Sequence, residues 1–283
     1  MIKYITVFFI FTLLFSCSRP PQAPSPAANS IMETTVSNES GTLEREAFIE
    51  NFWTETFFSA ELPEILKENI IYHLTQGPDF VMELLNILEG DPYLYILVDK
   101  KHSLGPNYAP LDLVELTEGF YRVTRQGHTL RRAAVESLEA MAAAARNDGV
   151  TLIAASAYRS YDYQEGVYTR LVGQMGRLEA DRVSAAPGHS QHQLGLVLDF
   201  FPIDDSFAST AASAWLERNA VRFGWSLSYP DNYEDITGYR WESWHYRYLG
   251  RDLAAFTEKY FNGIQQYALQ FIQSWLEAPV LIP

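Results

Sequence analysis

Two histidines, one aspartate and one glutamate have the types and the spacing needed for metal-assisted hydrolysis. The segment PGHSQHQLGLVLDFF carries His192 and Asp199, and the later segment ESWHYR carries Glu242 and His245. Neutral imidazole nitrogens and a carboxylate oxygen are the ligands of a catalytic zinc ion, which keeps a fourth position for water. Glu242 is then free to take a proton from that water. We therefore predict one Zn²⁺ per chain, held by His192, Asp199 and His245.

The chain around Asp199 predicts how this set is positioned. Residues 194–201 are a short apolar run without a polar helical face, which indicates a buried strand. Residues seven apart on a strand point to opposite faces, so His192 must precede the strand, on a loop. A buried aspartate is costly unless it is paired or binds a metal. For Asp199 alone, pairing with an arginine is the simpler interpretation, but the four residues together favour a metal. His189 is the rival ligand.

Three motifs in this order resemble those of a known enzyme family. They are Tyr158-Arg159-Ser160, the run from Ser190 to Asp199, and the segment from Glu242 to Arg247. Together they resemble the VanY-type zinc D,D-carboxypeptidases, which belong to the LAS group of cell-wall metallopeptidases. The resemblance extends roughly over residues 93–251. Members of the family remove D-alanine from peptidoglycan stem peptides, so it implies the same substrates here.

The resemblance also implies a fold and further site residues. The fold is α+β, a small and mostly antiparallel sheet flanked by helices, here with a helical N-terminal addition. Arg159 corresponds to an arginine that contacts substrate and steadies the charge growing on the attacked carbonyl oxygen, which a guanidinium can do with directed donors. By the same resemblance, Gln164 and Ser190 bind the peptide end and Tyr229 faces the substrate.

One departure from the family pattern bears on the choice of substrate. Many relatives carry arginine before the Tyr-Pro pair and lysine after it, where this chain has Ser228 and Asp231. An L,D-carboxypeptidase acting on tetrapeptide stems shares the same motifs and is the alternative activity; an endopeptidase is another. A catalytically inactive wall-binding lipoprotein is the alternative of a different class, but it would not need Glu242. A periplasmic metal carrier is a weaker alternative, because six dispersed histidines do not form a ligand-rich surface.

Composition limits the partners of the chain. The 283 residues include 21 lysines and arginines against 35 aspartates and glutamates, giving a net charge of −14. No basic stripe appears, which argues against nucleic acid as a partner. The length suits one main domain with an addition.

The N-terminus predicts export and a lipid anchor. Residues 1–16 have a basic start and a short apolar run, which are typical of a signal peptide. The sequence Leu-Phe-Ser-Cys resembles a bacterial lipobox, so Cys17, the only cysteine, is the predicted lipidation site. Residues 17–45 contain little that could form a core and predict a disordered tether. We expect an exported, membrane-anchored lipoprotein facing the periplasm or cell wall.

Hydrophobic periodicity predicts the remaining elements. Residues 46–92 show three short amphipathic helices, and residues 252–283 show two packed helices. Between them, residues 93–251 form the predicted zinc carboxypeptidase domain. Its predicted strands are 93–98, 151–157 and 223–230, its clearest helices are 130–146 and 215–224, and residues 238–248 form a β ribbon carrying Glu242 and His245.

Overall fold

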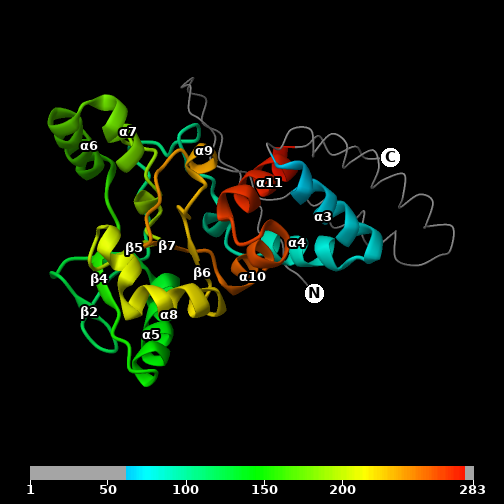
Figure 1. Ribbon diagram of the computed structural model, residues 1–283, viewed down its shortest axis with the longest axis horizontal. Coiled ribbons are helices and arrows are strands. Elements are labelled where there is room, and N and C mark those ends of the chain that lie inside the picture. The colour runs from blue at the N-terminus through cyan, green and yellow to red at the C-terminus, as the bar shows by residue number, and fades with distance from the viewer. Residues whose placement is uncertain (1–61, 278–283) are drawn as a thin grey trace, which may run out of the picture.

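Within residues 62–277 the chain folds around two large hydrophobic cores, one beneath a sheet and one inside a group of helices. The structure is a computed structural model that describes residues 62–277. Figure 1 shows the sheet with its covering helices on one side and the helical group on the other. The first of the three predicted N-terminal helices, the signal peptide, Cys17 and the tether lie outside the described residues. None of the helices within 62–277 has both the length and the apolar character that crossing a bilayer requires.

The central sheet has five strands in the order β2-β4-β5-β7-β6. Only β2 and β4 run parallel; the other neighbours are antiparallel. This is the α+β arrangement, small and mostly antiparallel, that the sequence predicts. The strands are β2 (Arg122–Val123), β4 (Ile153–Ser156), β5 (Val197–Phe200), β6 (Trp225–Leu227) and β7 (His245–Tyr248), while β1 (Leu113–Glu115) and β3 (Thr129–Arg131) pair separately.

Alternation along β5 gives the sheet two different faces. Leu198 and Phe200 face a core shared with helices α5 (Arg132–Asn147) and α8 (Ala211–Asn219). Asp199 lies between Leu198 and Phe200 in the sequence and therefore on the opposite face of the sheet. There it is in register with His245 of β7. Both faces are covered, so all four residues of β5 are buried. This explains why an almost continuous apolar run carries a single aspartate.

The second core joins the two ends of the described chain. Helices α3 (Glu64–Gln76) and α4 (Asp79–Glu89) pack against α10 (Arg251–Phe261) and α11 (Gln265–Glu277). Phe80 is fully buried among aromatic rings of α10 and α11, with the Tyr260 ring centre at 4.7 Å. The sequence presents the N-terminal and C-terminal helices as separate segments. In the structure they form one helical unit (Figure 1).

The prediction of a strand over residues 93–98 is wrong. The segment begins with a 3-10 helix, η1 (Pro92–Tyr95), and continues as irregular chain. The guanidinium of Arg247 donates to the carbonyl oxygens of Leu94 and Ile96, at 3.0 and 2.8 Å. An arginine side chain therefore takes the acceptors that a neighbouring strand would otherwise bind.

The other predicted elements differ mainly in their boundaries. The predicted β ribbon is strand only from His245, so Glu242 lies in the turn that precedes β7. The helix predicted over 215–224 is α8 followed by the 3-10 helix η4 (Ala220–Phe223). The remaining short elements are α6 (Tyr161–Met175), α7 (Arg177–Val183), η2 (Gln191–Leu194), η3 (Asp205–Ser209) and α9 (Glu234–Thr237).

Candidate metal centre and active site

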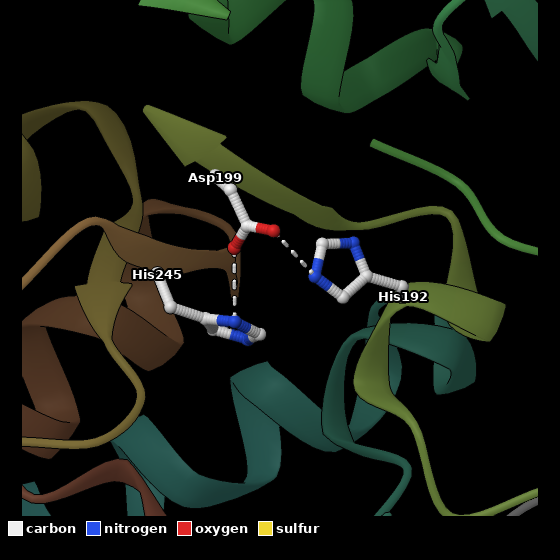
Figure 2. Close-up of side chains that lie close together, drawn as sticks. All are labelled: His192, Asp199 and His245. Carbon is white, nitrogen blue, oxygen red and sulfur yellow. Dashed lines mark ion pairs between the residues drawn. The ribbon is translucent and has the colours of Figure 1, made fainter. Parts of the chain in front are cut away.

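Three predicted ligands come together on the buried face of the sheet. Figure 2 shows the Asp199 carboxylate between the two imidazole rings. One oxygen, Oδ2, lies 3.1 Å from Nε2 of His192, and the other, Oδ1, lies 3.0 Å from Nδ1 of His245. The three side chains are at most 5% exposed. Among the described residues this is the only group of its kind with ligand atoms within 4.8 Å of one another.

Local backbone structure holds His192 in place. Ser190 caps the 3-10 helix η2, its hydroxyl accepting from the His192 backbone N–H, and Gly195 ends the helix at a φ of 70°. His192 therefore precedes the strand, as its spacing from Asp199 predicts. Its Nδ1 donates to the carbonyl oxygen of Ala157 at 2.6 Å. This hydrogen bond leaves the lone pair of Nε2 directed at the cluster, the usual way in which a ligating histidine is oriented.

The donor set fits a zinc ion. Two imidazole nitrogens and one carboxylate oxygen are the ligands that zinc takes in catalytic sites. Oδ1 of Asp199 accepts no hydrogen bond among the described residues and has only its ion pair with Nδ1 of His245, the nitrogen that faces the cluster, at 3.0 Å. Buried polar atoms are rarely left unpaired. The cluster thus has the composition, burial and spare acceptor capacity that a metal ion would use.

Electrostatics keeps the ligands in a binding-competent state. Burial and the charge of Arg159 lower the pKa of His192 to about 4, so this imidazole is neutral at pH 7. Burial by itself would raise the pKa of Asp199, but both histidines hold it well below its usual range. Burial likewise opposes protonation of His245, yet Asp199 and Glu242 raise the pKa of this residue. Metal and proton therefore compete mainly for His245.

Glu242 lies beside the cluster. Its Oε2 is 3.3 Å from Nδ1 of His245, and its side chain is 12% exposed. Its backbone N–H donates to the carbonyl oxygen of Tyr229, which ties this turn to the chain after β6. The structure thus places a second carboxylate at the edge of the ligand set.

Arg159 reaches the same cluster from the loop after β4. Its Nη2 lies 2.9 Å from Oδ2 of Asp199 and 2.6 Å from Nε2 of His192. Nε donates to Ser156 at 3.1 Å, and Nη1 donates to Oε1 of Gln164 at 3.1 Å. The side chain is one-fifth exposed. Arg159 is therefore fixed on both sides and still open to a ligand.

The structure gives Gln164 a supporting position. This side chain is fully buried; its Oε1 accepts from Arg159, and its Nε2 donates to the carbonyl oxygen of Ala185 at 2.7 Å. The oxygen of the amide thus holds the arginine, while its nitrogen anchors Gln164 to Ala185. Direct contact of Gln164 with a peptide stays a prediction, as do substrate contacts of Ser190 and Tyr229. Tyr229 packs its ring on His245, with 4.6 Å between ring centres.

His189, the rival ligand, lies elsewhere. Its Nδ1 contacts the carbonyl oxygen of Asp99 at 2.7 Å, and the residue is absent from the ligand cluster. Sequence reasoning gave no role to Asp99 or to Lys100, which follows it. Asp99 is buried, and Lys100 lies over the ring of Tyr239, which packs on Tyr229 beside His245. The sequence signal that could have pointed to this turn is the pattern Lys-x-His-x-Leu, which begins at Lys100.

Comparison with known proteins agrees with this geometry. The model of the VanY family, described as D-alanyl-D-alanine carboxypeptidase, matches residues 127–251. The chain is 37% identical to YodJ of Bacillus subtilis (strain 168) over 60% of this chain and 65% of that protein. It is 36% identical to a D-alanyl-D-alanine carboxypeptidase of Enterococcus faecalis over 43% of this chain and 48% of that protein. The chain thus spans less than two thirds of the length of either relative.

Two solved structures are similar over most of their own length. The LD-carboxypeptidase LdcB is 35% identical with a TM-score of 0.54, over 59% of this chain and 85% of that one. A D,D-pentapeptidase VanY, solved with Zn(II), is 31% identical with a TM-score of 0.51, over 62% and 98%. Sequence, fold and family model agree, and we conclude that this chain belongs to the VanY family of D-alanyl-D-alanine carboxypeptidases.

Proposed function

We propose that this protein is a zinc-dependent D,D-carboxypeptidase that removes the C-terminal D-alanine from peptidoglycan stem peptides. The observation that carries the proposal is the buried cluster of His192, Asp199 and His245 with the carboxylate of Glu242 3.3 Å from one ligand. A purely structural metal site has no need of that additional carboxylate. Bound zinc would supply a Lewis acid that polarises the carbonyl and makes water more acidic.

The residues of the chain have distinct roles in this proposal. Glu242 accepts a proton from the attacking water and returns it to the amine of the leaving D-amino acid. Arg159 donates to the oxygen of the attacked carbonyl as negative charge develops on it, and Gln164 and Ser156 keep the guanidinium in place. Tyr229, whose pKa burial raises well above its ordinary value, remains a neutral ring against His245.

An L,D-carboxypeptidase is the second candidate, because a solved LD-carboxypeptidase is 35% identical to this chain. The two activities differ in the stem they accept. Defined peptides can separate them: a pentapeptide ending in D-Ala-D-Ala and a tetrapeptide ending in one D-Ala. The peptides are analysed by mass spectrometry after incubation with and without a zinc chelator. We expect the pentapeptide to lose one alanine when no chelator is present and to stay intact when the chelator is added. Loss from the tetrapeptide alone would establish the L,D activity, and no loss from either would favour an endopeptidase or an inactive wall-binding protein.

We further propose that the protein is exported and held at a membrane through lipid on Cys17. The support is the lipobox-like sequence and the solitary cysteine. Two or more acyl chains give stable anchoring, whereas one is marginal. The Cys17→Ala variant should leave the membrane fraction for the soluble one, as measured by fractionation. If the variant stays with membranes, the lipid anchor is refuted.

A further inference from the structure

The turn that carries Lys100 is built on a buried carboxylate. Asp99 accepts from the backbone N–H groups of Lys101 and His102, each at 2.8 Å, and from Nε2 of Gln266 at 2.7 Å. Asp99 is 6% exposed. Its acceptors are used to fix the turn and to bind α11, so they do not neutralise the ammonium of Lys100. The backbone of Lys100 is therefore rigidly placed.

The side chain of Lys100 lies over the ring of Tyr239. Its Nζ lies 3.6 Å from the centre of the Tyr239 ring and donates to the backbone carbonyl oxygen of Asp181. Its stem packs on Gly238, where a Cβ would come within 2.6 Å of the lysine Cγ. Gly238 also has a φ of +76°, so that side of the stem is open only because the residue is glycine.

No carboxylate within residues 62–277 neutralises the ammonium of Lys100 by direct contact. Within the described part of the chain it forms no ion pair at 4 Å or less. An ammonium has three N–H donors, of which one is used by the Asp181 carbonyl and one points at the ring. Burial lowers the pKa of Lys100, against the opposing charges of Asp181 and Glu242. One donor of a partly desolvated cation thus remains available to a ligand.

Two tilted ring contacts connect this cation to the metal ligand His245. Tyr239 packs on Tyr229 with 4.7 Å between ring centres, and Tyr229 packs on His245 at 4.6 Å. Added to the 3.6 Å from Nζ to the Tyr239 ring, these distances put the ammonium at most about 13 Å from the His245 ring. An extended peptide covers that span in about four residues. Lys100 therefore lies within reach of a substrate residue close to the cleaved bond.

We propose that Lys100 binds a free carboxylate of the peptide substrate, a few residues from the bond that is cleaved. The inference rests on the proposed function, because it takes a stem peptide as the substrate. In such a peptide the glutamate is linked through its γ-carboxyl, which leaves its α-carboxylate free, and a diaminopimelate at the next position carries another. Either carboxylate could accept a charge-assisted hydrogen bond from the ammonium. Amidation of the carboxylate would remove that charge.

The test compares matched peptides and matched variants. In one comparison the glutamate α-carboxyl of the peptide is either free or amidated, and the next residue is lysine. In the second comparison the next residue is diaminopimelate, whose own carboxyl is either free or amidated. The wild-type protein should cleave the peptide with the free carboxylate faster than its amidated counterpart, either at the glutamate or at the diaminopimelate position. Lys100→Met should lower kcat/KM for that peptide by about ten- to hundredfold, mainly through KM, and leave the amidated peptide unchanged. Lys100→Arg should restore part of the preference.

A control variant and the zinc content define the contrary outcomes. Lys101→Met removes the same charge from the next residue and should keep the preference of the wild type. All variants should bind the same amount of zinc. Equal losses on free and amidated peptides, or a wild type that does not discriminate at either position, would overturn the role of Lys100 and leave the proposed function standing. A zinc-loaded wild type that cleaves no peptide at all would overturn both.

Discussion

Replacing Gln266 by leucine tests whether the helical unit supports the active-site domain. Gln266 lies on α11, outside the segment matched by the family model, and is 4% exposed. Its Nε2 donates to Oδ2 of Asp99 at 2.7 Å, across 167 residues of sequence. Leucine has a similar volume but no donor. The substitution therefore leaves a buried carboxylate oxygen without its partner.

The size of the effect follows from the charge on Asp99. A hydrogen bond to a charged group contributes about 1.5–3 kcal/mol to stability, and an acceptor left buried without a partner loses that amount. Burial by itself would raise the pKa of Asp99, but its hydrogen bonds from the turn and from Gln266 hold the pKa below its usual value. We expect Gln266→Leu to lower the free energy of unfolding at pH 7 by about 1.5–3 kcal/mol. For a chain of this size that corresponds to roughly 3–12 °C in Tm.

The effect should depend on pH with a definite sign. A carboxyl whose pKa is depressed on folding stabilises the protein fully above its unfolded pKa of about 3.9, and this contribution is lost as the pH falls through the folded pKa. Below that value Asp99 is protonated in both variants. The bond from Gln266 then becomes a neutral one, about half as strong. The difference between wild type and Gln266→Leu should therefore be smaller at acid pH than at pH 7, falling toward about 0.5–1.5 kcal/mol once the pH is below the folded pKa of Asp99.

Urea unfolding of the full chain, with a chelator present at both pH values, measures this difference. The matched control is Gln273→Leu on the same helix, at a more exposed position where the amide, within residues 62–277, donates to Glu277. That variant should change stability by less than about 0.5 kcal/mol. If Gln266→Leu changes stability by no more than the control, or by an amount that does not decrease as the pH falls through the folded pKa of Asp99, then Asp99 is not the group through which Gln266 acts.

Three further experiments test the site and the second core. Glu242→Gln should keep zinc but lower kcat by about 10²- to 10⁴-fold in the stem-peptide assay; near-normal turnover would exclude Glu242 from proton transfer. His245→Ala should lose zinc in equilibrium dialysis, whereas His189→Ala should retain it; the opposite pattern would exchange their roles. Phe80→Ala should cost about 3–5 kcal/mol in denaturant unfolding, since Phe80 is fully buried. Met82→Ala, at a position 52% exposed, should cost less than about 0.5 kcal/mol, and similar costs would argue against a packed second core.

The sequence was most informative where the chemistry depends on local spacing. Asp199 within an apolar run predicts a buried strand, and the seven-residue separation places His192 before it. Both features are present in the structure. The mostly antiparallel sheet is also as predicted. The short run at residues 93–98 misled because its carbonyl groups bind Arg247, a residue about 150 positions away, and not a neighbouring strand.

Only the tertiary structure showed which side chains contact the residues of the candidate site. Gln164 is buried, with its Oε1 on Arg159 and its Nε2 on Ala185, and its contact with a peptide stays a prediction. Neither Lys100 nor Gln266 stands out in the sequence, because an isolated lysine or glutamine is common on any surface. Each acquires its role only when distant segments pack, Lys100 against Tyr239 and Gln266 against Asp99.

The residue types and their short-range spacing thus determined the chemistry of the metal site, because ligand identity and strand alternation are local properties. The joining of the first and last helices around Phe80, and the link from α11 to the turn of Lys100, depend on which buried faces fit together. That fit is a property of shape and volume over the whole chain. For this reason only the tertiary structure could assign it.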